Sequence, residues 1–330
     1  MRALLLLAIA ACNGDHTPST PPPPDGHVSQ WTTGSAIPDP RLEPGVTALG
    51  QSVIVLGGFD TNVQHGLDIT TRVDRFDVAS QAWAGQLPDA PVAWTHIQLA
   101  GVGDEVYLLG GLEGVQYQAR GEAWRLDPSS NSWVSIAPIP AGLERGASGV
   151  VSGQGNIFLI GGASSTDALA SVLDYQIATD TWTQLPDLPS PRSHPAAMRM
   201  DDGTLIVVGG LATIDASQPL AEVWALPLNA TAWEARTAMP TARGGCAYGY
   251  VDGGLVCAGG EAGAAALHVV ERYDPVLDTW STEDEMPESR AGMQGAVVGT
   301  SLYVPGGASS LQFEPTDSLF IYDRLRTETR

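Results

Sequence analysis

Five arginines recur at one place in a repeating pattern along this chain of 330 residues. Six apolar runs each end in a Gly-Gly pair, and an Arg or a Trp stands sixteen or seventeen residues before each pair. The six residues at this position are Arg41, Trp94, Arg145, Arg192, Arg243 and Arg290. Guanidinium groups that converge on one site bind carboxylate, phosphate or sulfate groups in a bidentate manner. The spacing therefore predicts an anion-receptive ring, with an indole that can stack on a planar ligand.

The same arginines have a second interpretation, which is structural. Each guanidinium could pair with acids or carbonyl groups of an adjacent segment and hold that segment in place. Residues just after the Gly-Gly pairs bear on the choice, because they are expected on the same face. They are Asp60, Glu113, Ser164, Glu261 and Ser309. Their carboxylates could neutralise the arginines from within the protein, so the sequence leaves both interpretations open.

The elements that position these residues follow from an internal repeat of about 50 residues. The Gly-Gly pairs begin at Gly57, Gly110, Gly161, Gly209, Gly259 and Gly306. A Trp lies 26 to 28 residues before each pair, at Trp31, Trp83, Trp133, Trp182, Trp233 and Trp280. This nearly constant distance predicts a rigid block. The distance from a pair to the next Trp varies from 21 to 26 residues, which predicts a surface loop.

A large apolar residue stands seven residues before each internal Trp. These residues are Phe76, Leu126, Tyr175, Leu226 and Tyr273, and several are followed by Asp or Asp-Pro. Such a segment is typical of a strand, a tight turn and a second strand that carries the Trp. Each repeat is thus expected to contain four short strands.

These markers resemble the kelch repeat, whose signature is a Gly-Gly pair, an aromatic residue and a later Trp. The resemblance extends from Ser29 to the end of the chain. It implies an all-β fold, a six-bladed kelch-type β-propeller with four antiparallel strands per blade. The glycines would then allow close backbone approach between blades, and the Trp side chains would fill the space between them.

The two ends of this domain, residues 29–330, complement each other. Tyr322 begins a last unit in which no Trp follows, whereas Trp31 has no preceding strand of its own. We therefore expect the strand around Trp31 to complete the sixth blade and close the ring, which removes the free edge.

The first 28 residues predict export. A positive residue and a nine-residue apolar run, too short to span a bilayer, indicate a signal peptide over residues 1–11. The segment Ile9–Cys12 resembles the lipobox of bacterial lipoproteins, which implies that Cys12 is lipidated. Residues 12–28, with four consecutive prolines, predict an extended tether. An ordinary signal peptide with an incidental Cys is the alternative.

Charge and side-chain inventory exclude several functions. The chain has 37 acidic and 16 basic residues and a formal charge of −21, which excludes a general nucleic-acid binder. Four histidines lie in the propeller, at His65, His96, His194 and His268. We expect no metal or other cofactor, because no pair has ligand spacing and none repeats in frame, although His194 could reach the channel.

Two cysteines flank a predicted hairpin turn. Cys246 and Cys257 could form a cross-strand disulfide, which an exported chain permits, but the strand register is not readable from the sequence.

Together these features predict a lipid-anchored protein of the bacterial cell envelope, in the periplasm or on the outer surface. It would act as a monomeric binding module for a protein or glycan with acidic groups, engaged on the Arg-bearing channel face, and would touch the membrane only through Cys12. One alternative is a carbohydrate-active enzyme resembling kelch-type sialate epimerases, with arginines holding a carboxylate and Glu113 or Glu261 as acid/base. Another is a structural envelope-assembly protein. No catalytic residue is assigned.

Overall fold

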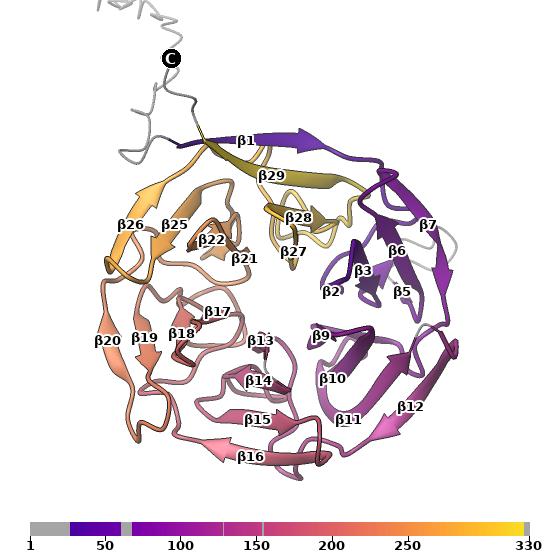
Figure 1. Ribbon diagram of the computed structural model, residues 1–330, viewed down its shortest axis with the longest axis horizontal. Helices are drawn as coiled ribbons and strands as arrows, with labels where there is room; N and C mark the ends of the chain where they lie inside the picture. Colours follow the sequence, from indigo (N-terminus) through magenta and orange to yellow (C-terminus); the bar gives the residue numbers. More distant parts are fainter. Residues whose placement is uncertain (1–26, 61–67, 128, 154, 327–330) are drawn as a thin grey trace, which may run out of the picture.

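Six antiparallel sheets surround a central axis in the computed structural model (Figure 1). The structure describes residues 27–60, 68–127, 129–153 and 155–326. Every element of this part of the chain is a β-strand, so it offers no helix that could cross a membrane. The predicted all-β, six-bladed propeller is confirmed. The predicted signal peptide, Cys12 and most of the tether lie outside the described residues.

Each blade runs from an inner strand at the axis to an outer strand at the rim. Blade one contains β2 (Gly45–Leu49), β3 (Ser52–Leu56), β6 (Val73–Asp77) and β7 (Ala82–Leu87). Blade two contains β9 (Leu99–Val102), β10 (Glu105–Glu113), β11 (Gln118–Asp127) and β12 (Ser132–Ile136), with a short extra strand β8 (Trp94–Thr95). Blade three contains β13 (Gly149–Gly153), β14 (Asn156–Ile160), β15 (Val172–Gln176) and β16 (Thr181–Leu185). Blade four contains β17 (Ala196–Arg199), β18 (Leu205–Val208), β19 (Val223–Leu226) and β20 (Glu234–Arg236).

Blade five contains β21 (Ala247–Val251), β22 (Gly254–Ala258), β25 (Val270–Asp274) and β26 (Thr279–Thr282). Blade six contains β27 (Ala296–Val298), β28 (Ser301–Pro305), β29 (Leu319–Arg326) and β1 (His27–Thr33). Two small hairpins, β4 (Phe59–Asp60) with β5 (Asp68–Ile69) and β23 (Glu261–Ala262) with β24 (Ala265–Ala266), follow Gly-Gly pairs.

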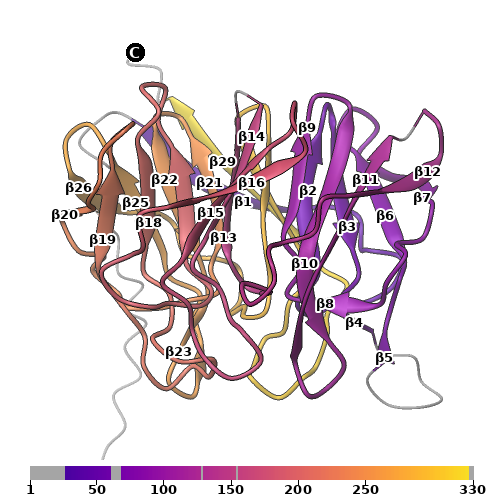
Figure 2. The ribbon, with the colours of Figure 1, turned by 90° about the horizontal axis from the view of Figure 1, so that it is seen from below.

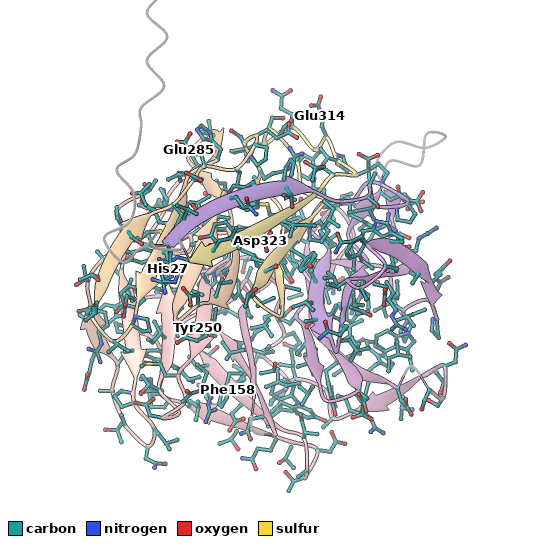
Figure 3. The ribbon with its side chains drawn as sticks, turned by 45° about the horizontal axis from the view of Figure 1, so that its top comes forward. His27, Phe158, Tyr250, Glu285, Glu314 and Asp323 are labelled. Atoms are coloured by element: carbon teal, nitrogen blue, oxygen red, sulfur yellow. A yellow bond between two sulfur atoms is a disulfide. The ribbon has the colours of Figure 1, made fainter. Side chains whose placement is uncertain are left out.

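The strand around Trp31 closes the ring, as expected. β1 pairs antiparallel with β29 over seven residue pairs, and Trp31 lies opposite Tyr322. Figure 3 shows β1 along the outer side of the strand that carries Asp323. At the start of β1, His27 Nε2 lies 3.1 Å from Asp252 Oδ2 of blade five. The last blade therefore contains both ends of the domain and is tied to its neighbour.

The Gly-Gly pairs mark the closest approach between blades. A Cβ on Gly161 would lie 2.5 Å from the carbonyl oxygen of Arg192 in the next blade, too close for any side chain. The backbone of Gly161 is also left-handed, with φ +61°, a conformation that favours glycine. Gly162 donates its N–H to the same carbonyl oxygen at 2.9 Å. The pair Gly306–Gly307 makes the same contacts with Arg41, so the sixth blade meets the first as the third meets the fourth.

The repeated Trp side chains join neighbouring blades at the rim. Each indole N–H donates to a main-chain oxygen in the segment that follows the outer strand of the preceding blade, at 2.9–3.0 Å. Trp182, for example, donates to Ala137 and packs 4.9 Å from the ring of Tyr175. The indoles are therefore held in the structure, as the packing interpretation predicts.

Candidate functional site

The five repeated arginines lie inside the blades. Their exposed fractions are 0–1%. Arg145 illustrates the pattern, because its Nη1 donates to the carbonyl oxygens of Gly161 at 3.0 Å and Ser171 at 2.9 Å. Its Nη2 donates to Ser171 Oγ at 2.7 Å. The guanidinium thus joins the end of the second strand of its own blade to the start of the third.

In three blades a carboxylate joins the neutral acceptors. Arg41 Nη2 lies 3.1 Å from Asp74 Oδ2, Arg243 pairs with the buried Glu271, and Arg290 Nη2 lies 2.6 Å from Glu288 Oε1. Arg145 and Arg192 donate instead to carbonyl and hydroxyl oxygens, and burial lowers the pKa of each to about 10.

These contacts support the structural interpretation of the repeated arginines and correct the expectation of an Arg-bearing ligand face. Their Nη atoms are held by acceptors of the same blade, and protein atoms cover them. Trp94 is equally enclosed, since it is 2% exposed and packs 5.6 Å from the ring of Trp124. A ligand in the channel therefore meets other residues.

The two predicted glutamates separate. Glu113 lies at the end of β10 with its side chain 45% exposed, and its Oε2 accepts a hydrogen bond from Arg120 Nε at 2.7 Å. Glu261 instead lines a central pocket. Asp60, which like Glu113 stands two residues after its Gly-Gly pair, has its Oδ2 3.8 Å from Arg41 Nη1.

This central pocket has a volume of about 450 Å³ and opens at one mouth of the channel. It is lined by residues of all six blades, from the segments that enter the inner strands and from the loops after the Gly-Gly pairs. Isolated bridges such as Gly146 with Ala163 and Gly244 with Glu261 join these two kinds of segment, which confirms that they share a face. Figure 2 shows β4, β5 and β23 at this end of the ring.

A belt of six residues surrounds the axis at this mouth, one from each blade. They are Glu43, His96, Ala147, His194, Gly245 and Gly292, each two residues after the Arg or Trp position. All have left-handed backbones, with φ between 51° and 63°. Five hydrogen bonds of 2.8–3.0 Å join the N–H of one belt residue to the carbonyl oxygen of the belt residue in the preceding blade. We call these six residues the channel belt.

Three side chains of the channel belt reach the pocket. Glu43, His96 and His194 all line it, and the rings of His96 and His194 lie 5.2 Å apart. A left-handed backbone is uncommon for residues other than glycine and is often found at functional sites. Main-chain hydrogen bonds hold the belt together, so its side chains are not needed for the contacts between blades.

Burial shifts the protonation of this group. It lowers the pKa of His96 to about 3 and that of His194 to about 4, so both rings are neutral at neutral pH. Burial also raises the pKa of Glu43, an effect that His194 opposes. Burial, together with the charge of Glu43, raises the pKa of Glu261 to about 7. The pocket floor therefore holds hydrogen-bond acceptors at neutral pH, with little fixed positive charge.

The sequence pattern does not reveal this group. The expectation that no histidine repeats in frame is wrong for His96 and His194, because they follow Trp94 and Arg192 by the same two residues. The expectation that no pair has ligand spacing concerns the sequence, whereas in the fold the ligand atoms of Glu43, His96 and His194 lie within 4.8 Å of one another. The feature in the sequence that could have revealed the group is the position two residues after the Arg or Trp, where the residue type varies from blade to blade.

The two cysteines do meet. Cys246 and Cys257 form a disulfide with their Cα atoms 5.6 Å apart. The bond joins the start of β21 to β22 within blade five and contributes to its core.

A ring of six four-stranded blades with a pocket at one mouth defines a β-propeller. The chain belongs to the kelch-repeat family, because residues 96–307 match the family described as the KLHDC2/KLHL20/DRC7 Kelch-repeats domain.

Similar proteins agree with this assignment. The chain is 29% identical over 318 residues to Kelch-like protein terF of Aspergillus terreus (strain NIH 2624 / FGSC A1156), a match covering 92% of this chain and 69% of that protein. It is 27% identical over 273 residues to Kelch-like protein 23 of Homo sapiens, covering 80% of this chain but only 46% of that protein. The solved structure titled "Structure of YjhT" matches with a TM-score of 0.72 at 16% identity, covering 86% of this chain and 95% of the other. That likeness shows the fold alone.

Proposed function

We propose that this chain is a protein-binding module that captures a segment of a partner in the pocket at the channel belt. The observation that carries the proposal is the pocket itself, which is central, has a volume of about 450 Å³, and receives residues from every blade. A kelch propeller offers such a surface as a rigid platform on which loops supply the contacts.

An apolar rim surrounds the polar floor. Phe313 is 47% exposed and Ile214 is 43% exposed, and both line the pocket from loops after Gly-Gly pairs. Phe313 and Tyr117 are each braced edge-to-face by the buried Phe59, at 5.6 and 6.3 Å between ring centroids. Exposed apolar side chains grouped around a cavity are typical of an interaction site.

The pocket favours a ligand different from the acidic one that the arginines suggested. Its floor contains Glu43 and Glu261 and the neutral rings of His96 and His194. These groups accept hydrogen bonds, so they suit a partner segment with apolar side chains and an N–H or cationic group. The formal charge of −21 also favours a basic partner.

Export and lipid anchoring through Cys12 remain part of the proposal. The disulfide between Cys246 and Cys257 supports export, because such bonds persist mainly in oxidising compartments. Labelling with radioactive palmitate in a bacterial host tests the anchor. We expect label on the full chain and none on Cys12→Ser, and an unlabelled full chain would contradict it.

The enzymatic alternative keeps one supporting observation. Glu261 lines the pocket with a pKa of about 7, a value suited to proton transfer, but the arginines that would hold a substrate carboxylate are buried. An acidic sugar held by these arginines would need them to leave their blades. We therefore favour binding over catalysis.

A displayed peptide library tests the binding function. The full chain is immobilised and selected peptides are measured against Phe313→Ser and Ile214→Ser, which should each weaken binding tenfold or more. Tyr250→Ser serves as the matched control, because Tyr250 is 50% exposed and borders a second cavity of about 340 Å³ farther along the inner strands (Figure 3). Equal loss in the control, or no selected peptide, would contradict the proposal.

A further inference from the structure

Three side chains of the channel belt form a group that the fold alone does not explain. Glu43, His96 and His194 each offer a ligand atom, and these atoms all lie within 4.8 Å of one another. His96 Nε2 lies 3.6 Å from Glu43 Oε2, which is too long for a hydrogen bond. They come from blades one, two and four, so tertiary structure alone brings them together.

A hydroxyl group lies within hydrogen-bond distance of Nδ1 of each imidazole ring and fixes the orientation of the ring. His96 Nδ1 lies 2.9 Å from Thr95 Oγ1, and His194 Nδ1 lies 3.1 Å from Ser193 Oγ. Ser193 Oγ in turn donates to the carbonyl oxygen of Thr213 at 2.9 Å. Because that hydroxyl proton is used, Ser193 Oγ must accept from His194, and Nδ1 of His194 therefore carries the ring proton.

The other ring can take the same tautomer. Nδ1 of His96 lies 2.9 Å from Thr95 Oγ1, whereas the contact of Thr95 Oγ1 with the carbonyl oxygen of Leu112 is long, at 3.4 Å, so the tautomer of His96 sets which atom donates. With Nδ1 donating, the lone pair of each ring is on Nε2. Nε2 of His194 is buried and has no hydrogen-bond partner among the described residues. Two nitrogen lone pairs and a carboxylate converge, an arrangement that a cation would stabilise.

We propose that Glu43, His96 and His194 bind a divalent transition-metal ion of the Zn²⁺ type at the floor of the pocket. Two imidazoles and one carboxylate are a typical set of three protein ligands for Zn²⁺, which leaves a further position for water or a ligand. The hydroxyl groups of Thr95 and Ser193 occupy the place of the outer partners that fix ligand orientation in metal sites. Mg²⁺ and Ca²⁺ prefer oxygen ligands and fit this set poorly.

The size of the group suits such an ion. Zn–N and Zn–O bonds of about 2.0–2.2 Å place tetrahedral ligand atoms about 3.3–3.6 Å apart. The 3.6 Å between His96 Nε2 and Glu43 Oε2 falls in this range, and the ligand atom of His194 lies within 4.8 Å of both. The open position faces the pocket, where Glu261 and Tyr117 also lie. This metal site does not depend on the proposed protein partner. A bound ion would use the lone pairs of Glu43, His96 and His194, so Glu261 would be the acceptor left on the pocket floor for a partner's N–H or cationic group.

Metal titration of the full chain, carrying a tag without histidines, tests the inference. After chelator treatment, Co²⁺ is added and its visible ligand-field absorption is recorded, followed by displacement with Zn²⁺. We expect one ion per chain, displacement by Zn²⁺ but not by Mg²⁺ or Ca²⁺, and a higher Tm in the presence of Zn²⁺.

Variants locate the site. Glu43→Gln, His96→Ala and His194→Ala should each weaken Co²⁺ binding at least tenfold, while the metal-free Tm of Glu43→Gln reports whether the fold is intact. His268→Ala is the matched control, because His268 is 49% exposed and lies beside Glu285 at the surface. Binding that survives in His96→Ala and His194→Ala, that is lost equally in the control, or that is absent from the unmodified chain would overturn the proposal.

Discussion

Two positions of the same repeat, only two residues apart, have opposite roles. The arginine position holds Arg in five blades of six, is buried, and is held by acceptors of its own blade. The channel belt holds Glu, His, Ala, His, Gly and Gly, and the side chains of its Glu and both His line a pocket. In this propeller, the residue that repeats maintains the fold, and the residue that varies determines the chemistry of the channel.

The physical reason is that side-chain atoms make the structural contacts at the arginine position, whereas main-chain atoms make them at the channel belt. A guanidinium joins two strands through its side chain, so its replacement leaves buried carbonyl or carboxylate groups without partners. The belt is joined by main-chain hydrogen bonds from one blade to the next, and any residue that tolerates a left-handed backbone can supply them. Side-chain identity is therefore constrained at the first position and free at the second.

The largest effect is expected from opening the ring, which tests whether the arginine position and the channel belt keep their roles only in a closed propeller. Removing residues 1–33 deletes β1, which pairs with β29 over seven residue pairs and carries Trp31. We expect the loss of cooperative unfolding, measured by circular dichroism, because β29 becomes an open edge. Removing residues 1–26 is the control and should leave the transition intact. Equal melting of the two truncations would contradict closure by β1.

The next effect removes one arginine. Arg243→Ala should lower the free energy of unfolding by about 3–5 kcal/mol, because it leaves the buried carboxylate of Glu271 unpaired. Urea denaturation measures the change. The double variant Arg243→Ala with Glu271→Ala should recover part of the loss. A cost below about 1 kcal/mol for the single variant would show that the arginine position does not hold the blade.

A matched pair sharpens the comparison by placing the same residue at both positions of blade three. Arg145→His should cost about 3 kcal/mol, since the carbonyl oxygens of Gly161 and Ser171 each lose one of their donors and the hydroxyl of Ser171 loses its guanidinium partner. Ala147→His should change stability by less than about 1 kcal/mol, because Ala147 has φ 52° and His occupies two equivalent belt positions at 51° and 52°. Equal costs in urea denaturation would remove the distinction.

The smallest effect concerns the pocket floor and depends on pH. Burial raises the pKa of Glu261 from 4.5 to about 7, so its protonated form stabilises the fold and that contribution is lost as pH rises through about 7. Glu261→Gln should therefore increase stability at pH 8 by on the order of 1 kcal/mol and change it little at pH 5. The urea midpoint at both pH values measures this. The same shift at both would contradict it.

Much of the fold could be predicted from local patterns. The Gly-Gly pairs and the Trp spacing predict six blades, because each marks a contact that is repeated between adjacent blades. The absence of a Trp after Tyr322 predicts that a strand from the other end of the domain completes the last blade. The role of the arginines could not be decided in this way. Their acceptors, such as Ser171 and Glu271, lie about 26 to 28 residues away, and no spacing rule distinguishes a paired guanidinium from an open one.

The candidate site was less predictable than the fold. His96 and His194 lie 98 residues apart in the sequence, and Glu43 lies 53 residues before His96, so no ligand motif links them. The disulfide between Cys246 and Cys257 was undecided for a simpler reason, because a shift of one residue in the register of β21 and β22 would turn one sulfur away.

The amino-acid sequence by itself determined the architecture of this protein, since a repeated pattern of apolar runs, glycines and indoles has one efficient way to bury its sheets, as stacked blades around an axis. Only the tertiary structure decided which polar groups meet. Closing the ring buries the arginines among acceptors of their own blades, and it brings one residue of every blade to the channel belt. Convergence at an axis depends on three-dimensional position, which the linear spacing of single residues does not contain.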